Sequence, residues 1–148
     1  VKSELFNTCP EASPMPYARE VLQAVRDRGL RIVLVTGSGQ RSLLDRLEQA
    51  VPGCFHEDYM VTAYDVVHGK PNPEPYLIGL DKAGVHASQA MVVENAPLGV
   101  QAGHAAGIYT LALNTGTLPD DILWESGADC VLPSMQALSE QTCRFFGK

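Results

Sequence analysis

Apolar runs rich in β-branched residues alternate along this chain with segments of helical spacing, and this alternation constrains the fold most strongly. The clearest run is LRIVLVT at residues 30–36, a continuous apolar stretch that predicts a strand buried on both faces, as in a parallel sheet. Shorter runs predict strands at residues 59–62, 90–93, 108–113 and 130–132. Helical spacing predicts helices at residues 16–28, 41–50, 73–84, 97–107, 119–126 and 134–146.

Strands and helices that follow one another at this spacing favour right-handed βαβ units, and therefore an α/β fold with a doubly wound parallel sheet. A chain of 148 residues is long enough for one domain with a substantial core. Ligands in such sheets bind beyond the carboxyl ends of the strands. The candidate functional residues therefore lie just after the predicted strands, at residues 36–40, 62–70, 94–97 and 114–116.

The net charge of −6 and the absence of any Lys/Arg run argue against a nucleic-acid partner. No apolar run is long enough to cross a membrane, so we expect no membrane partner either. The cysteines are scattered and form no C-x-x-C pair, which indicates reduced thiols in a cytoplasmic protein. They are Cys9, Cys54, Cys130 and Cys143.

The segment VTGSG places a hydroxyl and two glycines directly after the first long apolar run. Thr36 ends the run, and Gly37 and Gly39 flank Ser38. Glycines allow a ligand to approach the backbone closely, and backbone N–H groups ahead of a helix suit an anion. A dinucleotide-binding loop would have a third glycine where this chain has Ser42, and a plain strand-to-helix turn is the other alternative.

Lys70 lies in the segment GKPNPEPY, between Gly69 and Pro71. The prolines that follow stiffen this loop, and a stiff loop can hold an ammonium group against a phosphate. A solvated lysine is the alternative, but the position after the second predicted strand favours the ligand side of the sheet.

Glu94 and Asn95 follow the apolar run at residues 90–93. A carboxylate at the end of a buried strand is unfavourable without a partner, and oxygen ligands on a loop suit Mg²⁺. In the alternative interpretation, Asn95 caps the helix that begins near Pro97. Both functions are compatible, with Asn95 as the cap.

A hydroxyl, a lysine and an acid at the ends of three successive strands resemble the motifs of the haloacid dehalogenase superfamily of phosphohydrolases. The context GKPNPEPY and VVENAPLGVQAGHAAG is most similar to the β-phosphoglucomutase-like subgroup, over residues 14–132. Thr36 matches the second family motif and Lys70 the third. Glu94 matches the fourth motif, in which Asn95 stands where the family usually has Asp.

The resemblance implies a Rossmann-like core and a Mg²⁺-dependent phosphatase of small phosphorylated metabolites, sugar phosphates included. It implies that Thr36, with the backbone of Gly37 and Ser38, holds the phosphate. Thr36 and Lys70 would be the catalytic residues, with Lys70 bridging phosphate and nucleophile. A β-phosphoglucomutase-like phosphomutase is an alternative activity.

The resemblance further implies that Glu94 and Asn95 bind Mg²⁺. Because a carboxamide brings no negative charge, Asn95 in place of Asp predicts weak metal binding by this chain alone.

One family motif has no counterpart, because no D-x-D occurs in the sequence. In the family that motif follows the first strand and supplies the nucleophilic Asp. Asp65 follows a predicted strand, but at a position where the family has a loop. Residues 1–15 resemble the end of a helical cap domain and its hinge, and residues 16–148 the core. We therefore expect a chain that begins within the cap, with a non-catalytic phosphate-binding or regulatory domain as the alternative.

Without its first strand, the family sheet would have an opening between the strands at 31–36 and 90–93. Unpaired buried backbone groups destabilise a fold by roughly 1–3 kcal/mol each. We therefore expect the two strands to pair directly, to self-associate through their open edges, or to need the missing segment.

Overall fold

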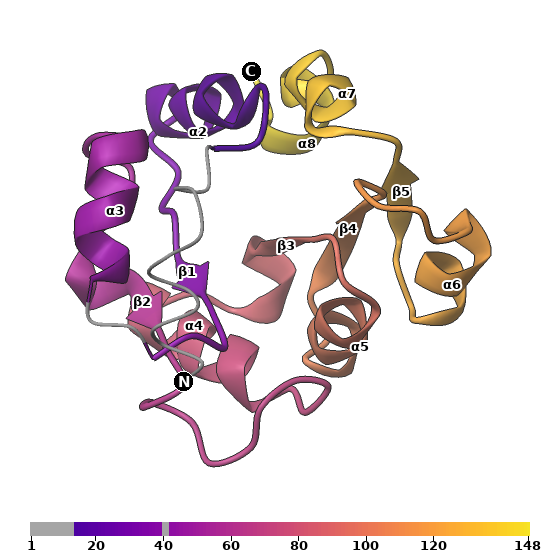
Figure 1. The fold of residues 1–148 in the computed structure, drawn as a ribbon, viewed down its shortest axis with the longest axis horizontal. Helices are drawn as coiled ribbons and strands as arrows, with labels where there is room; N and C mark the ends of the chain where they lie inside the picture. The colour runs from indigo at the N-terminus through magenta and orange to yellow at the C-terminus, as the bar shows by residue number, and fades with distance from the viewer. Residues whose placement is uncertain (1–13, 40–41) are drawn as a thin grey trace, which may run out of the picture.

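The computed structural model describes residues 14–39 and 42–148, in which parallel strands are flanked by helices (Figure 1). The strands are β1 (Leu34–Val35), β2 (Met60–Val61), β3 (Met91–Glu94), β4 (Tyr109–Leu113) and β5 (Cys130–Leu132). The α-helices are α2 (Ala18–Asp27), α3 (Leu43–Ala50), α4 (Glu74–Ala83), α5 (Pro97–Ala105), α6 (Asp120–Glu125), α7 (Met135–Ser139) and α8 (Thr142–Phe146). Two 3₁₀ turns are η1 (Glu57–Tyr59) and η2 (Ala87–Gln89).

These elements follow the alternation expected from the sequence, and the α/β fold class is confirmed. Most of the expected cap segment, residues 1–13, lies outside the described residues, as do the two residues 40–41 ahead of α3.

The strands form two parallel sheets, one of two strands and one of three. In the larger sheet β4 is central, and its residues Leu111, Ala112 and Leu113 pair with β5 in a continuous register. In the smaller sheet Leu34 pairs with Met60 on β2. Because all the strands are parallel, their carboxyl ends lie at one edge of each sheet, where the candidate residues follow.

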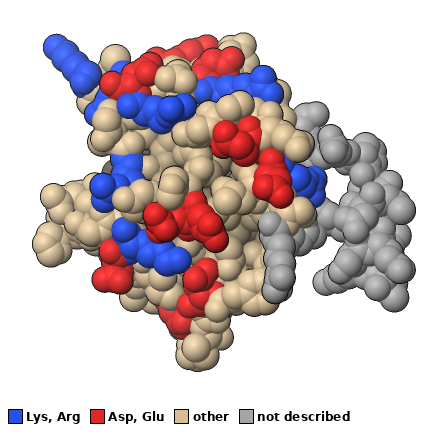
Figure 2. Space-filling view, turned by 90° about the vertical axis from the view of Figure 1, so that its left-hand side faces the viewer, with Lys and Arg blue, Asp and Glu red and all other residues tan. Residues whose placement is uncertain are grey.

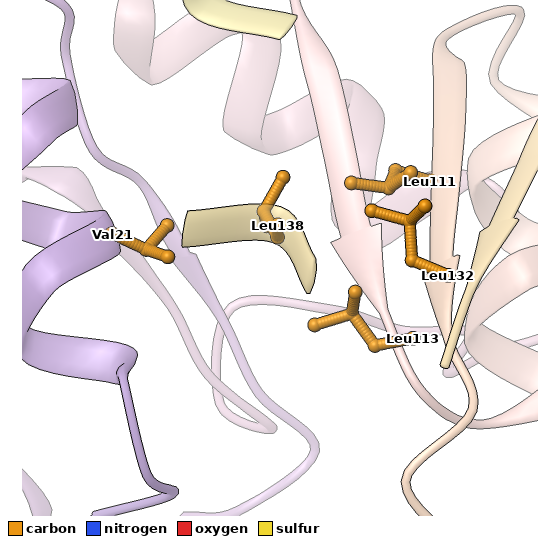
Figure 3. Packing of buried hydrophobic residues seen from close by; sticks show 5 residues of the cluster. All are labelled: Val21, Leu111, Leu113, Leu132 and Leu138. Atoms are coloured by element: carbon orange, nitrogen blue, oxygen red, sulfur yellow. The ribbon is translucent and has the colours of Figure 1, made fainter. Parts of the chain in front are cut away.

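Helices cover both faces of the larger sheet, as a doubly wound fold requires. On one face, leucines from β4, β5 and α7 pack against Val21 of α2 (Figure 3). On the other face, α4 and α5 bury a cluster that includes Tyr76 and Val92. Leu111 and Ala112, adjacent on β4, are fully buried on opposite faces, so β4 is buried on both sides as predicted.

The strand at residues 30–36 is shorter and more exposed than predicted. Only Leu34 and Val35 form β1, and no residue of the run is fully buried. Val93 on β3 is 41% exposed, so this strand is not buried on both faces either. The cause is that β1 pairs only with β2, and β3 only with β4. A strand with one neighbour makes backbone hydrogen bonds on one side only, so fewer of its residues are held in extended pairing. Its side chains also have fewer neighbouring residues to bury them.

The expected direct pairing of the strands at 31–36 and 90–93 is not observed. The two strands belong to different sheets, β1 to the first and β3 to the second. Thr36 N donates to Val61 O at 2.9 Å, so the neighbouring Val35 backbone groups point away from β2 because successive residues alternate. The opening predicted from the sequence is therefore retained in the fold.

The single terminal helix predicted at residues 134–146 is wrong. The structure has two short helices, α7 and α8, separated at Gln141, whose backbone leaves the helical region. Both helices contact α2. Arg28, just after α2, donates to Gly147 O at 2.6 Å and to Thr142 Oγ1 at 3.5 Å. The break lets α8 turn back onto α2, an arrangement that sequence periodicity does not report.

Charged side chains of both signs are interspersed on the face turned toward the viewer in Figure 2. Among the described residues, no helix combines the length and the apolar character that a membrane span requires.

Candidate phosphate site

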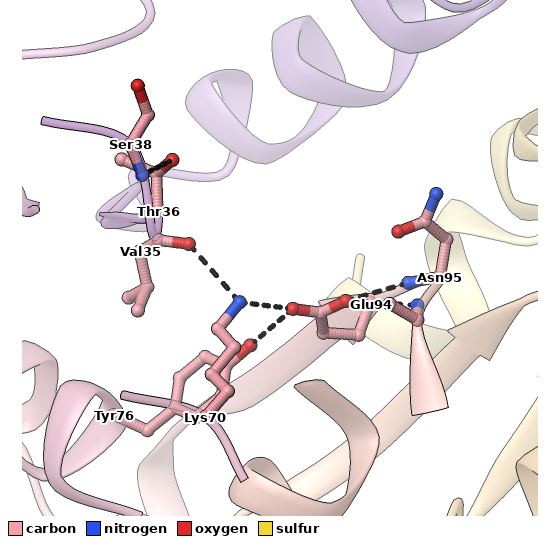
Figure 4. Close-up of polar contacts among 8 residues, drawn as sticks. Val35, Thr36, Ser38, Lys70, Tyr76, Glu94 and Asn95 are labelled. Atoms are coloured by element: carbon pink, nitrogen blue, oxygen red, sulfur yellow. Dashed lines mark hydrogen bonds and ion pairs between the residues drawn. The ribbon is translucent and has the colours of Figure 1, made fainter. Parts of the chain in front are cut away.

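Lys70 and Glu94 meet between the two sheets. Lys70 lies in the loop between β2 and α4, and Glu94 is the last residue of β3. Lys70 Nζ forms an ion pair with Glu94 Oε1 and lies 3.5 Å from the carbonyl oxygen of Val35 on β1 (Figure 4). The lysine therefore connects the carboxyl end of one sheet to that of the other.

Each carboxylate oxygen of Glu94 accepts two hydrogen bonds. Besides Lys70, Oε1 accepts from the Tyr76 hydroxyl at 2.8 Å. Oε2 accepts from the backbone N–H groups of Asn95, at 3.0 Å, and Ala96, at 3.2 Å. A carboxylate offers about four lone-pair directions, so the protein itself fills the acceptor capacity of Glu94.

These contacts hold Glu94 in its charged form. Burial by itself would raise the pKa of this carboxyl group, but the hydrogen bond and the positive charge of Lys70 outweigh it. The Tyr76 hydroxyl and the Ala96 N–H act in the same direction, and the pKa lies below its ordinary value. Burial and the negative charge of Glu94 raise the pKa of Tyr76, so its hydroxyl stays protonated and donates.

The Lys70 ammonium keeps access to solvent and to a ligand. Its side chain is 22% exposed, against 11% for Glu94, and Nζ lies 5.1 Å from the centre of the Tyr76 ring. A lysine ammonium has three N–H donors. Glu94 and Val35 take two of them among the described residues, which leaves one for an anion.

The loop after β1 begins with Thr36, which directly follows Val35, the residue whose carbonyl oxygen contacts Lys70. Thr36 Oγ1 accepts from Ser38 N at 3.1 Å, and Ser38 O accepts from Ala63 N at 3.4 Å. The Thr36 hydroxyl can still donate its proton, while Ser38 N–H points back to Thr36. Gly37 is exposed, and nothing lies within 4 Å of the place where a Cβ would stand. The structure thus gathers Thr36, Gly37 and Lys70 along one edge.

Gly99 explains how the Glu94 carboxylate fits against the first turn of α5. A Cβ at Gly99 would lie 2.1 Å from Glu94 Cδ and 2.1 Å from Oε1, far inside contact distance. Only glycine lets the helix approach so closely that Glu94 reaches both Lys70 and the backbone N–H groups ahead of α5. The glycine in the sequence APLGV therefore has a specific steric role.

Glu94 and Asn95 do not by themselves fit a Mg²⁺ ion. The acceptor positions of Glu94 are filled, and Asn95 contributes a neutral carboxamide. The Asn95 side chain is exposed, and its Nδ2 donates to Thr115 Oγ1 at 3.3 Å rather than to the backbone of α5. The predicted helix-capping role of Asn95 is therefore not observed: the N-cap residue of α5 is Ala96, and it makes no side-chain cap hydrogen bond. Within residues 14–39 and 42–148, no three His, Cys, Asp or Glu residues gather in a metal-binding arrangement.

Three partners of the predicted residues were not anticipated from the sequence. They are the Tyr76 hydroxyl, the Val35 carbonyl and the Thr115 hydroxyl. Only Tyr76 has a signal in the sequence, since a tyrosine on the buried side of a helix needs a partner for its hydroxyl. The contacts with the Val35 carbonyl and the Thr115 hydroxyl depend on the positions of the strands in space, which the sequence does not reveal.

Comparison with known proteins matches residues 3–107 to the haloacid dehalogenase-like hydrolase family. Hexitol phosphatase A of Escherichia coli strain K12 is 33% identical over 84% of this chain and 56% of its own length. A phosphorylated carbohydrates phosphatase of Thermotoga maritima is 32% identical over 84% of this chain and 57% of its own length. The chain thus spans a little over half of these relatives.

A solved structure of a Bacteroides vulgatus protein assigned to the β-phosphoglucomutases superposes with a TM-score of 0.93 and 51% identity. The match covers 99% of this chain and 60% of that protein. The parallel sheets and their flanking helices are therefore shared with a close structural relative.

Replacing Glu94 with Gln should lower the free energy of unfolding by about 2 kcal/mol at pH 7. The substitution removes the negative charge that strengthens the hydrogen bonds to Glu94, and it leaves the largely buried Lys70 ammonium without its ionic partner. The pKa of Glu94 is depressed below the ordinary value of 4.5, so the difference should hold above pH 4.5. It should then shrink as the pH falls through the lowered folded-state pKa. Urea unfolding of both proteins from pH 7 to pH 3 measures this.

The matched control is Glu125→Gln on α6, at an exposed position, which should change stability by less than about 0.5 kcal/mol at every pH. Equal effects of the two substitutions at pH 7 would contradict the assigned role of Glu94.

Replacing Gly99 with Ala should displace the Glu94 carboxylate and lower the free energy of unfolding by about 2 kcal/mol, since the added methyl group overlaps a packed side chain. Gly116→Ala is the control, because open space surrounds that position and its φ is not in the left-handed region. Thermal unfolding compares the two variants. A Gly99→Ala protein as stable as Gly116→Ala would show that α5 does not press against Glu94.

Proposed function

Because the chain belongs to the haloacid dehalogenase-like hydrolase family, in its β-phosphoglucomutase-like subgroup, we propose that this edge is the phosphate site of a phosphatase. The proposed substrates are small phosphorylated carbohydrates and polyols. The observation that carries the proposal is the Lys70 ammonium, which Glu94 and the Val35 carbonyl hold at the end of β1, one residue before Thr36, with one donor left for an anion.

In this proposal the residues bind and neutralise the phosphate. Thr36 donates its hydroxyl proton to a phosphate oxygen, and the exposed backbone at Gly37 lets the phosphate approach. Ser38 would join through its backbone once its N–H turns from Thr36 toward the ligand. Lys70 offsets the negative charge of the transferring group, which is the main contribution a protein makes to phosphoryl transfer. Glu94 positions Lys70 and keeps it charged.

The relatives support the substrate class. The names of the two curated relatives specify hexitol phosphates and phosphorylated carbohydrates. A phosphate attached to an uncharged carbon skeleton would present its negative charge to Lys70.

The 148 residues contain no D-x-D, so the proposed site binds phosphate without supplying the family's nucleophile. Asp65 does not replace it, because its Oδ2 accepts from Thr62 N at 2.7 Å and from the Thr62 hydroxyl at 2.8 Å. Its Oδ1 lies 3.3 Å from Lys82 Nζ. This observation favours a second candidate function for the 148-residue chain, a phosphate-binding domain without hydrolytic activity.

Magnesium is the proposed cofactor of turnover, as is general for phosphatases of this family. Because the acceptors of Glu94 are filled and Asn95 is neutral, a Mg²⁺ ion here would need acidic oxygen ligands from elsewhere. Bound at such a site, the ion would neutralise charge on the phosphoryl oxygens.

Isothermal titration of the 148-residue chain with inorganic phosphate should show one site, and Thr36→Val should weaken binding by about tenfold through loss of one hydrogen bond to a charged ligand. Thr62→Val is the matched control, because Thr62 follows β2 and contacts Asp65. It should leave phosphate affinity within about twofold of the parent.

The same chain should hydrolyse p-nitrophenyl phosphate no faster than buffer containing Mg²⁺. Phosphate binding that is insensitive to Thr36→Val would refute the site. Rapid hydrolysis by the pure chain would refute the conclusion that it lacks a nucleophile.

A further inference from the structure

A pocket of about 330 Å³ lies at the carboxyl ends of β4 and β5. Three segments line it: residues 15–17 before α2, residues 114–116 after β4, and residues 133–136 after β5. Its volume is at the lower end of the range for small-ligand pockets, which begins at roughly 300 Å³. It therefore suits a compact ligand group.

No charged side chain lines the pocket. Its polar groups are hydroxyls and amides, from Tyr17, Asn114, Thr115, Ser134 and Gln136, and methionines and prolines supply the apolar wall. A phosphate or a carboxylate would find no ionic partner here. The lining instead suits a group that is neutral, compact and rich in hydroxyls.

Two of the hydroxyls are oriented by the protein. Thr115 Oγ1 accepts from Asn95 Nδ2 at 3.3 Å, and Ser134 Oγ accepts from Ala137 N at 3.1 Å. A hydroxyl that accepts one hydrogen bond keeps its proton to donate. Both groups can therefore donate to hydroxyl oxygens of a ligand.

A hydrogen bond between Asn95 and Thr115 joins the segment that carries Glu94 to the lining of the pocket. Asn95 directly follows Glu94, which holds Lys70, and Thr115 belongs to the pocket lining. β3 and β4 are adjacent strands, so their carboxyl ends lie roughly 5 Å apart. Glu94 at the end of β3 and Thr115 after β4 therefore follow neighbouring strands at one edge of the sheet, and a polyol phosphate several carbons long can extend from Lys70 toward the pocket.

We propose that this pocket holds the uncharged polyol portion of the substrate while Lys70 and Thr36 hold its phosphate. The inference rests on the proposed function and adds a determinant of specificity within the described core. It selects esters that carry several hydroxyl groups over inorganic phosphate. Tyr17, which lines the pocket and is 43% exposed, offers aromatic surface to the C–H groups of the ligand.

The test is a titration of the ¹⁵N-labelled chain, followed by NMR, with inorganic phosphate, sorbitol and sorbitol 6-phosphate. Phosphate should shift amide signals near residues 36–38 and 70 only. Sorbitol 6-phosphate should also shift signals at residues 114–116 and 133–136, and should bind about tenfold more tightly than phosphate, as expected for two added hydroxyl contacts.

Gly116→Phe should fill the pocket, because open space surrounds Gly116 and its φ is not in the left-handed region. This variant should lose the tighter binding of sorbitol 6-phosphate and keep the affinity for phosphate. Thr117→Phe is the control, one residue outside the lining, and should behave like the parent. Thr115→Val should weaken the binding of sorbitol 6-phosphate by about fivefold, and Thr115→Ser, which keeps the hydroxyl, should bind it like the parent.

Different outcomes would refute the pocket assignment and the proposed phosphate site. Sorbitol 6-phosphate that binds no more tightly than phosphate, or that binds Gly116→Phe as well as the parent, overturns the pocket assignment and leaves the phosphate site intact. Phosphate that shifts no signals near Thr36 and Lys70 overturns the proposed function, and the pocket assignment fails with it.

Discussion

The ion pair between Lys70 and Glu94 is the interaction on which the rest of this structure depends. It joins a loop anchored on the two-stranded sheet to the edge of the three-stranded sheet, and the same ammonium reaches the Val35 carbonyl. Glu94 in turn accepts a hydrogen bond from the backbone N–H of Ala96 ahead of α5, and Gly99 makes room for its carboxylate. One carboxylate thereby fixes the lysine that we assign to phosphate binding and stabilises the contact between the sheets.

The opening between β1 and β3 gives this ion pair its importance. Each strand has a neighbour on one side only, so the backbone groups on the other side lack the partners that a continuous sheet would supply. Lys70 satisfies one of them, the carbonyl of Val35. The exposure of Val93 and the short length of β1 follow from the same cause. These open edges favour association with another extended segment, and self-association of the chain stays a prediction.

The alternation of apolar runs and helical segments was sufficient to predict the fold class, the element order and the edge on which Thr36, Lys70 and Glu94 lie. It overestimated the strand at residues 30–36, because periodicity reports side chains and does not reveal whether a strand has one neighbour or two. The contacts of Tyr76 and Thr115 with the site depend on spatial packing across elements. The hydrogen bonds that fill all four acceptor positions of Glu94 were likewise not predictable from the sequence, and they lead us to propose that Glu94 positions Lys70.

The assignment of Lys70 and Thr36 to phosphate binding can be tested with a crystal structure of the 148-residue chain grown with sodium tungstate, a heavy analogue of phosphate. We expect one tungstate within hydrogen-bonding distance of both Lys70 Nζ and Thr36 Oγ1, with the Lys70–Glu94 contact retained. Tungstate bound elsewhere, with Lys70 still in contact only with Glu94 and Val35, would contradict it.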